Sequence, residues 1–317
     1  MILVFLPNDI PCFNVADAQV ERFRRLLPAN ADLPVVVCRT ESEFTAHLPG
    51  ATAVFVWSFK QEWFALAPKL RHVCTPAAGR DYFHVAPPPQ VTMHYGTFHG
   101  AIMGETALAC VLAVSHGILP FAREMKDGTG EDAAWPRLRL AAAARRISGA
   151  TIAILGFGHI GRIFARMAKP FGPRLVGVTQ SPHPEYRDEF PDVALATAGD
   201  LPAVLPEADH VVCFLPSGAA TTKLLDARKL SLMKRGAFLY NFGRGNLVDE
   251  DALAAALHAG RLGGAVLDVF QAEPLPATSP LRRCPNCYLY PHASAFSPDY
   301  LDLYFEKAAA AMARAED

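Results

Sequence analysis

Residues 151–161 read Thr-Ile-Ala-Ile-Leu-Gly-Phe-Gly-His-Ile-Gly, an apolar run followed by a G-x-G-x-x-G pattern. The run predicts a buried strand at 151–155, and the glycine pattern predicts a turn that opens a helix. Gly156 permits the tight turn, and Gly158 lets the backbone approach a pyrophosphate at the positive end of the helix. Gly161 allows close packing of the helix on the strand. This stretch therefore favours a dinucleotide-binding fold, the alternative being a structural strand–turn–helix whose glycines match by chance.

Outward from this stretch, strand-like and helix-like segments alternate along most of the chain. Before it, apolar strands are predicted at 2–6, 35–38, 51–57 and 70–75, with helices between them. After it, strands are predicted at 175–179, 210–215, 237–241, 265–269 and 287–290, again with helices between them, and a closing helix at 298–315. Such alternation predicts an α/β fold built on parallel sheets. An almost wholly apolar helix at 104–118 is expected to be buried, in the domain or against a second subunit.

Composition excludes several classes of protein. Of 317 residues, 51% are hydrophobic and 19% charged, which supplies a sizeable core and argues against disorder. Thirty basic and 31 acidic residues give a net charge of -1, so neither nucleic acid nor an anionic membrane surface is an expected partner. No apolar run approaches the roughly 18–20 residues that span a bilayer. The seven cysteines do not suggest a disulfide framework. A cytoplasmic globular protein is expected.

The segment after the second strand of the dinucleotide unit bears on the choice of cofactor. An acidic residue at this position would bind the adenosine ribose and repel a 2′-phosphate. The sequence has Thr179, Gln180 and Ser181 instead, with the first acid at Glu185. We therefore expect NADP(H) to be favoured and NAD(H) to remain possible. The candidate cofactor contacts are Gly156, Phe157, Gly158, His159, Ile160, Gly161, Thr179, Gln180, Ser181, Leu215 and Pro216.

Three further motifs follow predicted strands. Arg244 lies in Asn-Phe-Gly-Arg-Gly, Glu273 in Leu-Asp-Val-Phe-Gln-Ala-Glu-Pro, and His292 in Tyr-Pro-His-Ala-Ser. With the glycine loop, these motifs resemble the signature of the D-2-hydroxyacid dehydrogenase family, and the resemblance covers nearly the whole chain. The compact spacing from Glu273 to His292 is most similar to the glyoxylate/hydroxypyruvate reductase branch.

Reduction of a 2-oxo acid gives each of these residues a chemical role. His292 would protonate the carbonyl oxygen as general acid, because imidazole titrates nearest the working pH. Glu273 would orient the ring and favour its charged form. Arg244 would bind the substrate carboxylate and polarise the ketone through its planar guanidinium. Taken singly, each could be an ordinary structural residue; the three together, downstream of the glycine loop, predict the catalytic set.

The resemblance implies more than the motifs themselves. It implies a Rossmann-type doubly wound nucleotide domain, residues 98–291, inserted into a flavodoxin-like substrate domain, residues 1–97 and 292–317. It also implies that backbone N–H groups near Ala78 and Gly79 hold the substrate carboxylate, that Asp268 receives the nicotinamide amide, and that the chain forms a homodimer. A strand-terminal Asp that caps a turn is the alternative for Asp268.

The substrate and several side chains stay open. Glyoxylate and hydroxypyruvate are the leading candidates, and a bulkier 2-oxo acid admitted by Arg80, His99 and Phe296 is the second. A dinucleotide-sensing regulatory module on the same fold is the third. His94 and His99 are candidates for substrate contact or for a packed hinge. Cys284 and Cys287 form a C-x-x-C without a second ligand pair, so we expect no metal site.

Overall fold

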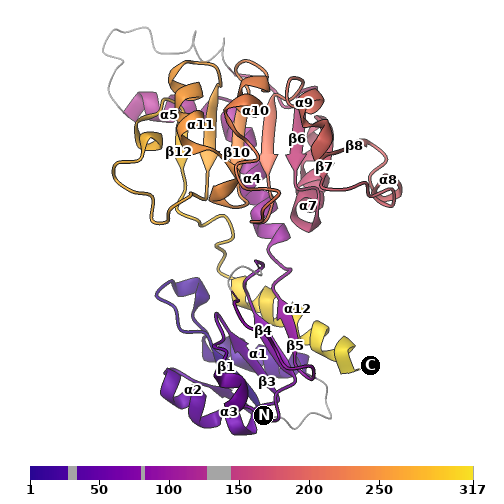
Figure 1. Cartoon of the computed structure of the whole chain (residues 1–317), viewed down its shortest axis with the longest axis vertical. Coiled ribbons are helices and arrows are strands. Elements are labelled where there is room, and N and C mark those ends of the chain that lie inside the picture. Colours follow the sequence, from indigo (N-terminus) through magenta and orange to yellow (C-terminus); the bar gives the residue numbers. More distant parts are fainter. Residues whose placement is uncertain (28–33, 80–82, 127–143, 317) are drawn as a thin grey trace. The chain divides into compact units, whose positions relative to one another are not determined.

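The structure, a computed structural model, describes residues 1–27, 34–79, 83–126 and 144–316 (Figure 1). The chain divides into two compact units, Met1–His99 with Phe296–Asp317, and Gly100–Ala295. The second unit is therefore inserted into the sequence of the first. The boundary predicted at 291/292 had placed His292 in the first unit, whereas this division places it in the second. Its backbone N–H donates to the carbonyl oxygen of Asp268 at 2.8 Å, which ties His292 to the second sheet.

The first unit is built on a five-stranded parallel sheet in the order β2-β1-β3-β4-β5. This is the strand order of flavodoxin-like folds. Its strands are β1 (Ile2–Phe5), β2 (Val35–Val37), β3 (Ala53–Val56), β4 (His72–Thr75) and β5 (Thr92–Tyr95). Its helices include α1 (Asp17–Leu26), α2 (Glu41–His47), α3 (Trp63–Leu66) and α12 (Tyr300–Glu316).

Helix α12 returns the end of the chain to this unit. The ring of Phe305 lies 4.8 Å from Phe23 of α1 and 5.7 Å from Phe55 of β3. On the surface, the guanidinium of Arg22 binds both carboxylate oxygens of Asp302 at 2.7 Å. Buried aromatic rings dominate the packing energy of such contacts, so the apolar face rather than the exposed ion pair holds α12 in place.

The second unit is built on a seven-stranded parallel sheet in the order β12-β11-β10-β9-β6-β7-β8. The order is that of a Rossmann fold extended by one strand. The strands are β6 (Thr151–Leu155), β7 (Arg174–Thr179), β8 (Val193–Thr197), β9 (His210–Cys213), β10 (Phe238–Asn241), β11 (Gly264–Leu267) and β12 (Cys287–Leu289). Its helices include α4 (Gly100–Ser115), α5 (Ile118–Lys126), α7 (His159–Ala168), α8 (Tyr186–Glu189), α9 (Leu201–Val204), α10 (Ala227–Leu232) and α11 (Glu250–His258).

Helices cover both faces of this sheet, as expected for a doubly wound fold. Ala153 and Leu155 point into an apolar core shared with α9, α10 and α11. Ile152 and Ile154 point to the opposite face, where the core is shared with α4 and α7. Successive side chains of a strand point to opposite faces of the sheet, and here both faces are covered by an apolar core. For this reason, 151–155 is a continuous hydrophobic run.

Two local predictions are confirmed in helices of this unit. Asp249 caps α11, its carboxylate accepting the N–H of Ala252 at 3.2 Å, and Gly260 follows that helix with φ +61°. Helix α4 buries a face that includes Gly104, Ala107 and Val111, and it packs against α7. Within the described ranges, no helix has the length and apolar character that a membrane crossing requires.

His210 in β9 is a buried histidine with a defined hydrogen bond. Its Nδ1 lies 3.0 Å from the hydroxyl oxygen of Tyr240 in β10. Burial lowers the pKa of His210 from 6.5 to about 4, while the neighbouring Asp209 opposes the shift. Because the pKa is lower in the folded chain than in the unfolded one, protonation favours unfolding. The unfolding free energy is therefore at its full value above pH 6.5, where His210 is neutral in both states, and it decreases as the pH falls from 6.5 toward 4.

We expect the unfolding free energy to fall between pH 7 and pH 5 by about 2 kcal/mol more in the parent chain than in His210→Gln. Urea unfolding at both pH values measures this difference. His258→Gln, which removes an exposed histidine from the last turn of α11, is the matched control and should keep the parental pH dependence. An unchanged pH dependence in His210→Gln would show that His210 is not buried in its neutral form.

Candidate active site

Parallel pairing brings the functional segments of the second unit to one edge of its sheet. The register aligns Asn241 of β10 with Leu267 of β11, and Leu267 with Leu289 of β12. The loops carrying Arg244, Glu273 and His292 therefore all leave the carboxyl ends of adjacent strands. In open α/β sheets this edge is where ligands bind.

The glycine loop at the end of β6 has the geometry its pattern predicts. Gly156 has φ +96°, and a Cβ placed there would lie 3.0 Å from the backbone N of Leu215. A Cβ on Gly161 would lie 2.4 Å from the carbonyl oxygen of Gly156. A Cβ on Gly158, in contrast, would meet no atom within 4 Å. Gly156 and Gly161 are thus required by the fold itself, whereas the space beside Gly158 is open to a ligand.

Helix α7 begins directly after this space. Its N-cap is Gly158, which provides no side-chain acceptor for the N–H groups of the first turn. Such N–H groups and the helix dipole together favour an anion. The loop therefore fits the pyrophosphate of a dinucleotide.

The other residues of the pattern differ in what they can offer to a ligand. The ring of Phe157 is fully buried, at the position where a Cβ on Gly177 would clash with it. Only the backbone of Phe157 can contribute to binding. Ile160 is half-buried, whereas His159 is exposed at the start of α7.

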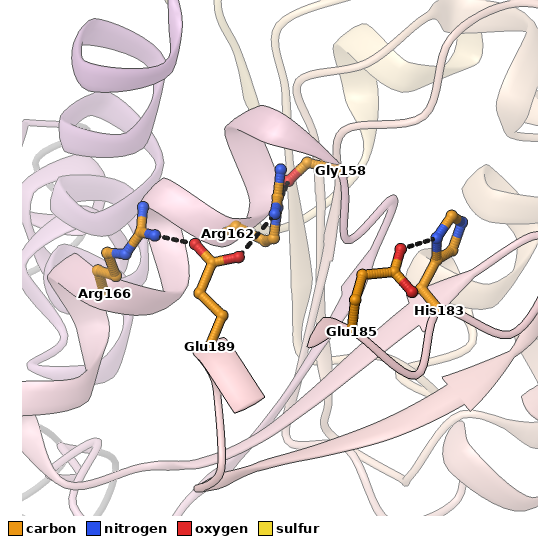
Figure 2. Close-up of polar contacts among 6 residues, drawn as sticks. All are labelled: Gly158, Arg162, Arg166, His183, Glu185 and Glu189. Carbon is orange, nitrogen blue, oxygen red and sulfur yellow. Dashed lines mark hydrogen bonds and ion pairs between the residues drawn. The ribbon is translucent and has the colours of Figure 1, made fainter. Parts of the chain in front are cut away.

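The last residue of β7 and the two residues after it are uncharged. The hydroxyl of half-buried Thr179 donates to the carbonyl oxygen of Ser181 at 2.7 Å. Gln180 and Ser181 are exposed. The next acid, Glu185, is bound by Nδ1 of His183 at 2.8 Å, and this hydrogen bond lowers the pKa of Glu185 (Figure 2).

Arg162 is a cation at the glycine loop that the sequence analysis did not single out. Its Nε donates to the carbonyl oxygen of Gly158 at 3.3 Å, and its Nη1 donates to Glu189 at 2.8 Å (Figure 2). Its guanidinium also lies 4.4 Å from the ring centroid of Tyr186. The available signal was its position immediately after Gly161, one helical turn from Gly158.

The loop of Arg244 is held by two close backbone approaches. A Cβ on Gly243 would lie 2.4 Å from the carbonyl oxygen of Leu215, and one on Gly245 would lie 1.9 Å from the carbonyl carbon of Phe270. The amide of Asn241 donates to the carbonyl oxygen of Arg244 at 3.0 Å. These contacts place half-buried Arg244 between the loop after β9, where Leu215 and Pro216 lie, and the loop that leads to Glu273.

Glu273 and His292 form a hydrogen-bonded pair. Nδ1–H of His292 donates to Oε2 of Glu273 at 2.7 Å, across 19 residues of sequence. The other carboxylate oxygen accepts the backbone N–H of Phe270 at 2.9 Å. Their side chains are 39% and 34% exposed, so a ligand can reach the ring. The contact between Phe270 and Gly245 links this pair to the Arg244 loop.

Asp268 is buried and engaged by the backbone next to His292. Its carboxylate accepts N–H bonds from Ala293 at 2.7 Å and Ser294 at 3.3 Å, and it is 1% exposed. Burial raises the pKa of Asp268, while its hydrogen bonds with Ser294 and Ala293 and the nearby His292 lower it in part. The carboxylate therefore secures the segment that carries His292, which has φ +52°.

The first unit holds the remaining predicted residues. Ala78 is exposed and Gly79 half-buried in the loop after β4, while Arg80 lies outside the described residues. Nε2 of His94 is 3.0 Å from Nδ1 of His72 in the neighbouring strand. Buried His99 bonds the hydroxyl of Tyr300 through its Nε2 at 3.0 Å. Both histidines thus take part in the packing of this unit.

The C-x-x-C pair has a structural setting. Cys284 and Cys287 are both buried, and the thiol of Cys284 donates to the carbonyl oxygen of Pro280 at 3.4 Å. Burial also raises the pKa of Cys284, which disfavours the thiolate that a metal requires. Among the residues that the structure describes, no group of three or more potential ligands could hold a metal ion.

Comparisons with known proteins agree with this geometry. The family model for the NAD-binding domain of D-isomer specific 2-hydroxyacid dehydrogenases matches residues 108–294. Glyoxylate/hydroxypyruvate reductase B of Pectobacterium carotovorum is 35% identical over 233 residues, covering 71% of this chain and 69% of that protein. Glyoxylate reductase of Korarchaeum cryptofilum is 33% identical over 239 residues, covering 74% and 70%.

A solved structure matches nearly the whole chain. The D-isomer specific 2-hydroxyacid dehydrogenase of Xanthobacter autotrophicus Py2, in complex with NADPH and MES, has a TM-score of 0.78 and 25% identity. It covers 99% of this chain, which in turn covers 94% of it. The fold and site therefore define an α/β oxidoreductase that uses a nicotinamide dinucleotide. The chain belongs to the D-isomer specific 2-hydroxyacid dehydrogenase family and is similar to the glyoxylate and hydroxypyruvate reductases within it.

We expect Asp268→Asn to reduce the unfolding free energy by about 1–3 kcal/mol, because its amide oxygen can accept only one of the N–H bonds from Ala293 and Ser294 and its amide nitrogen can accept neither. Urea unfolding measures the loss. Asp251→Asn, at an exposed position in α11, is the control and should stay within about 0.5 kcal/mol of the parent. If Asp268→Asn keeps full stability and loses only dinucleotide affinity, Asp268 acts on the nicotinamide amide instead.

Proposed function

We propose that the protein reduces a small 2-oxo acid, with glyoxylate and hydroxypyruvate as the first candidates, to the D-2-hydroxy acid, and that NADPH is its favoured cofactor. The observation that carries the proposal is the pair formed by His292 and Glu273 at 2.7 Å, beside the loop of Arg244. The names of the reductases that resemble the chain support the choice of substrates.

His292 acts as the general acid. Because Nδ1 is occupied by Glu273, Nε2 is the nitrogen that delivers a proton to the carbonyl oxygen of the substrate. The carboxylate of Glu273 stabilises the charged imidazolium and fixes the orientation of the ring. Its own orientation is fixed by the N–H of Phe270.

Arg244 binds the substrate carboxylate and polarises the ketone, since a guanidinium can donate to two oxygens at once. The negative charge that develops on the carbonyl oxygen is stabilised by the same cation. Backbone N–H groups near Ala78 and Gly79 in the first unit are proposed to hold the carboxylate as well.

The glycine loop and the first turn of α7 bind the dinucleotide, whose nicotinamide supplies the hydride that no side chain can provide. Neutral, accessible Gln180 and Ser181 stand where an acid would repel a 2′-phosphate, and Arg162 adds a positive charge at the adjoining loop. These features support the preference for NADPH.

A dinucleotide sensor is the competing function. A sensor needs no proton donor paired with a carboxylate, so the His292–Glu273 pair favours the enzyme.

A homodimer is the proposed assembly. Leu108 and Leu112 of α4 are only partly buried, and Ile118 at the start of α5 is 61% exposed. This apolar surface supports association with a second copy.

Addition of hydroxypyruvate or glyoxylate to the purified protein should oxidise NADPH, and NADH more slowly, as followed by absorbance. We expect Arg244→Ala to lower kcat/KM by about 10²–10³-fold and His292→Asn by about 10²–10⁴-fold, with little change in NADPH affinity. Exposed Arg228→Ala and His258→Asn are the matched controls. Bound NADPH without oxidation by any 2-oxo acid would favour the sensor.

The glycines should separate folding from binding. We expect Gly158→Ala to lower stability by no more than about 1 kcal/mol, because alanine is a poorer N-cap than glycine, but to weaken NADPH binding at least tenfold, because its methyl group enters the open space beside α7. Gly161→Ala should instead lower stability, by about 1–3 kcal/mol, since its methyl group meets the carbonyl of Gly156. Thermal unfolding and a fluorescence titration with NADPH measure the two effects. Unchanged NADPH affinity in Gly158→Ala would refute the placement of the pyrophosphate.

A further inference from the structure

A cavity of about 510 Å³ opens at the amino edge of the second sheet, and we call it the amino-edge cavity. The described residues that line it all belong to the second unit. The register aligns His210 of β9 with Ile152 of β6 and with Phe238 of β10, so the segments that precede these strands meet here. Because β6 is five residues long, roughly 15 Å of strand separates this edge from the glycine loop. The volume is that of a pocket for a small molecule.

Arginine side chains form the outer part of the lining. Arg145 and Arg146 come from the segment before β6, and Arg235 comes from the turn before β10. All three are exposed. Segments more than 80 residues apart in sequence thus bring guanidinium groups to one cavity. A guanidinium donates to two oxygens of a phosphate or carboxylate at once, which makes such a lining suited to an anion.

The acidic residue of the described lining, Asp209, does not neutralise these arginines. One of its carboxylate oxygens accepts the backbone N–H of Thr151 at 2.9 Å, and the other binds Nζ of Lys234 at 2.6 Å. Its charge is therefore balanced by Lys234. Within the part of the chain that the structure describes, the guanidinium groups of Arg146 and Arg235 have no hydrogen-bond or ion-pair partner. The cavity consequently carries an excess of positive charge.

The inner wall of the cavity offers a buried donor. His210 and Ser115 line it and are only 8% and 6% exposed. The hydroxyl of Ser115 donates to the carbonyl oxygen of Val111 at 2.8 Å, so its oxygen accepts from Nε2–H of His210, at 3.4 Å. Nδ1 of His210 in turn accepts the hydroxyl of Tyr240 at 3.0 Å. This network assigns the proton to Nε2, and the long bond to Ser115 leaves that N–H able to donate to a ligand.

We propose that the amino-edge cavity binds a phosphate-bearing small molecule, at a site separate from the dinucleotide site. Arg146 and Arg235 bind the phosphate oxygens, and Nε2–H of His210 donates to the oxygen that reaches the inner wall. Charge-assisted hydrogen bonds of this kind are about twice as strong as neutral ones. The proposal does not depend on the reduction of a 2-oxo acid, because no residue of the cavity belongs to the candidate active site.

Isothermal titration of inorganic pyrophosphate into the protein saturated with NADPH tests the proposal, because the cofactor then occupies the glycine loop. At constant ionic strength we expect a Kd below about 1 mM. Arg146→Gln and Arg235→Gln should each raise the Kd by about ten- to a hundredfold, through the loss of a charge-assisted hydrogen bond. Both arginines are exposed, so their replacement should preserve the fold.

Three further variants locate the site. Arg228→Gln removes an exposed charge from α10, and Arg244→Ala removes the cation of the candidate active site, so both should keep the parental Kd. Arg146→Lys keeps the charge without the planar fork and should bind with an intermediate Kd. In NMR spectra, pyrophosphate should shift the ring signals of His210 and leave those of exposed His258 unchanged.

Several results would overturn the proposal. Absence of pyrophosphate binding up to about 10 mM would do so directly. An equal loss in Arg228→Gln would reduce the effect to net charge, and a loss confined to Arg244→Ala would place the anion in the candidate active site. Binding without a shift of the His210 signals would place the anion outside the cavity. None of these results would bear on 2-oxo acid reduction, which the oxidation of NADPH tests separately.

Discussion

The close approach of strand-end loops at the carboxyl edge of the second sheet is the constraint on which the site depends. Gly156 and Gly243 each come so near Leu215, and Gly245 so near Phe270, that a side chain at any of them would collide with backbone. Along this edge, the loop after β9 therefore contacts the loops after β6 and β10, and the loop after β10 contacts the loop after β11. The loops that carry Arg244 and Glu273 come together because Gly245 has no side chain, and His292 is joined to Glu273 by a hydrogen bond.

Two carboxylates near His292 have different roles because their surroundings differ. Asp268 is buried, accepts the N–H groups of Ala293 and Ser294, and secures the backbone of the loop. Glu273 is about one-third exposed and bonds the imidazole itself. A buried carboxylate satisfied by amides is suited to hold structure, whereas an accessible one beside a histidine can support a proton transfer. Replacing Asp268 would disturb the position of His292, and replacing Glu273 would disturb its charge.

The first unit contributes a second carboxyl edge of the same kind with different chemistry. There the loop 77–79 offers backbone groups, while Phe13, Trp57 and Phe296 offer apolar surface. The two sheet edges thus carry different kinds of groups, ionisable side chains in the second unit and backbone and aromatic groups in the first.

The sequence alone determined the interior strands, the glycine loop and the identity of the three motif residues. Buried parallel strands such as β6 must be apolar on both faces, and that requirement is visible in one dimension. The edge strands β5 and β8 were missed because they are only partly buried. Thr92–Tyr95 lacks an apolar run, and Val193–Thr197 contains two alanines, which have a low strand propensity. Only the tertiary structure decided that His292 bonds Glu273 and that Asp268 accepts backbone N–H groups. It also decided that Arg162 donates to the carbonyl oxygen of Gly158. The contacts of the ring of Phe13 with those of Trp57 and Phe296 are likewise tertiary. These contacts join residues from different loops, and their distances are set by sheet register and packing rather than by the local pattern of side chains.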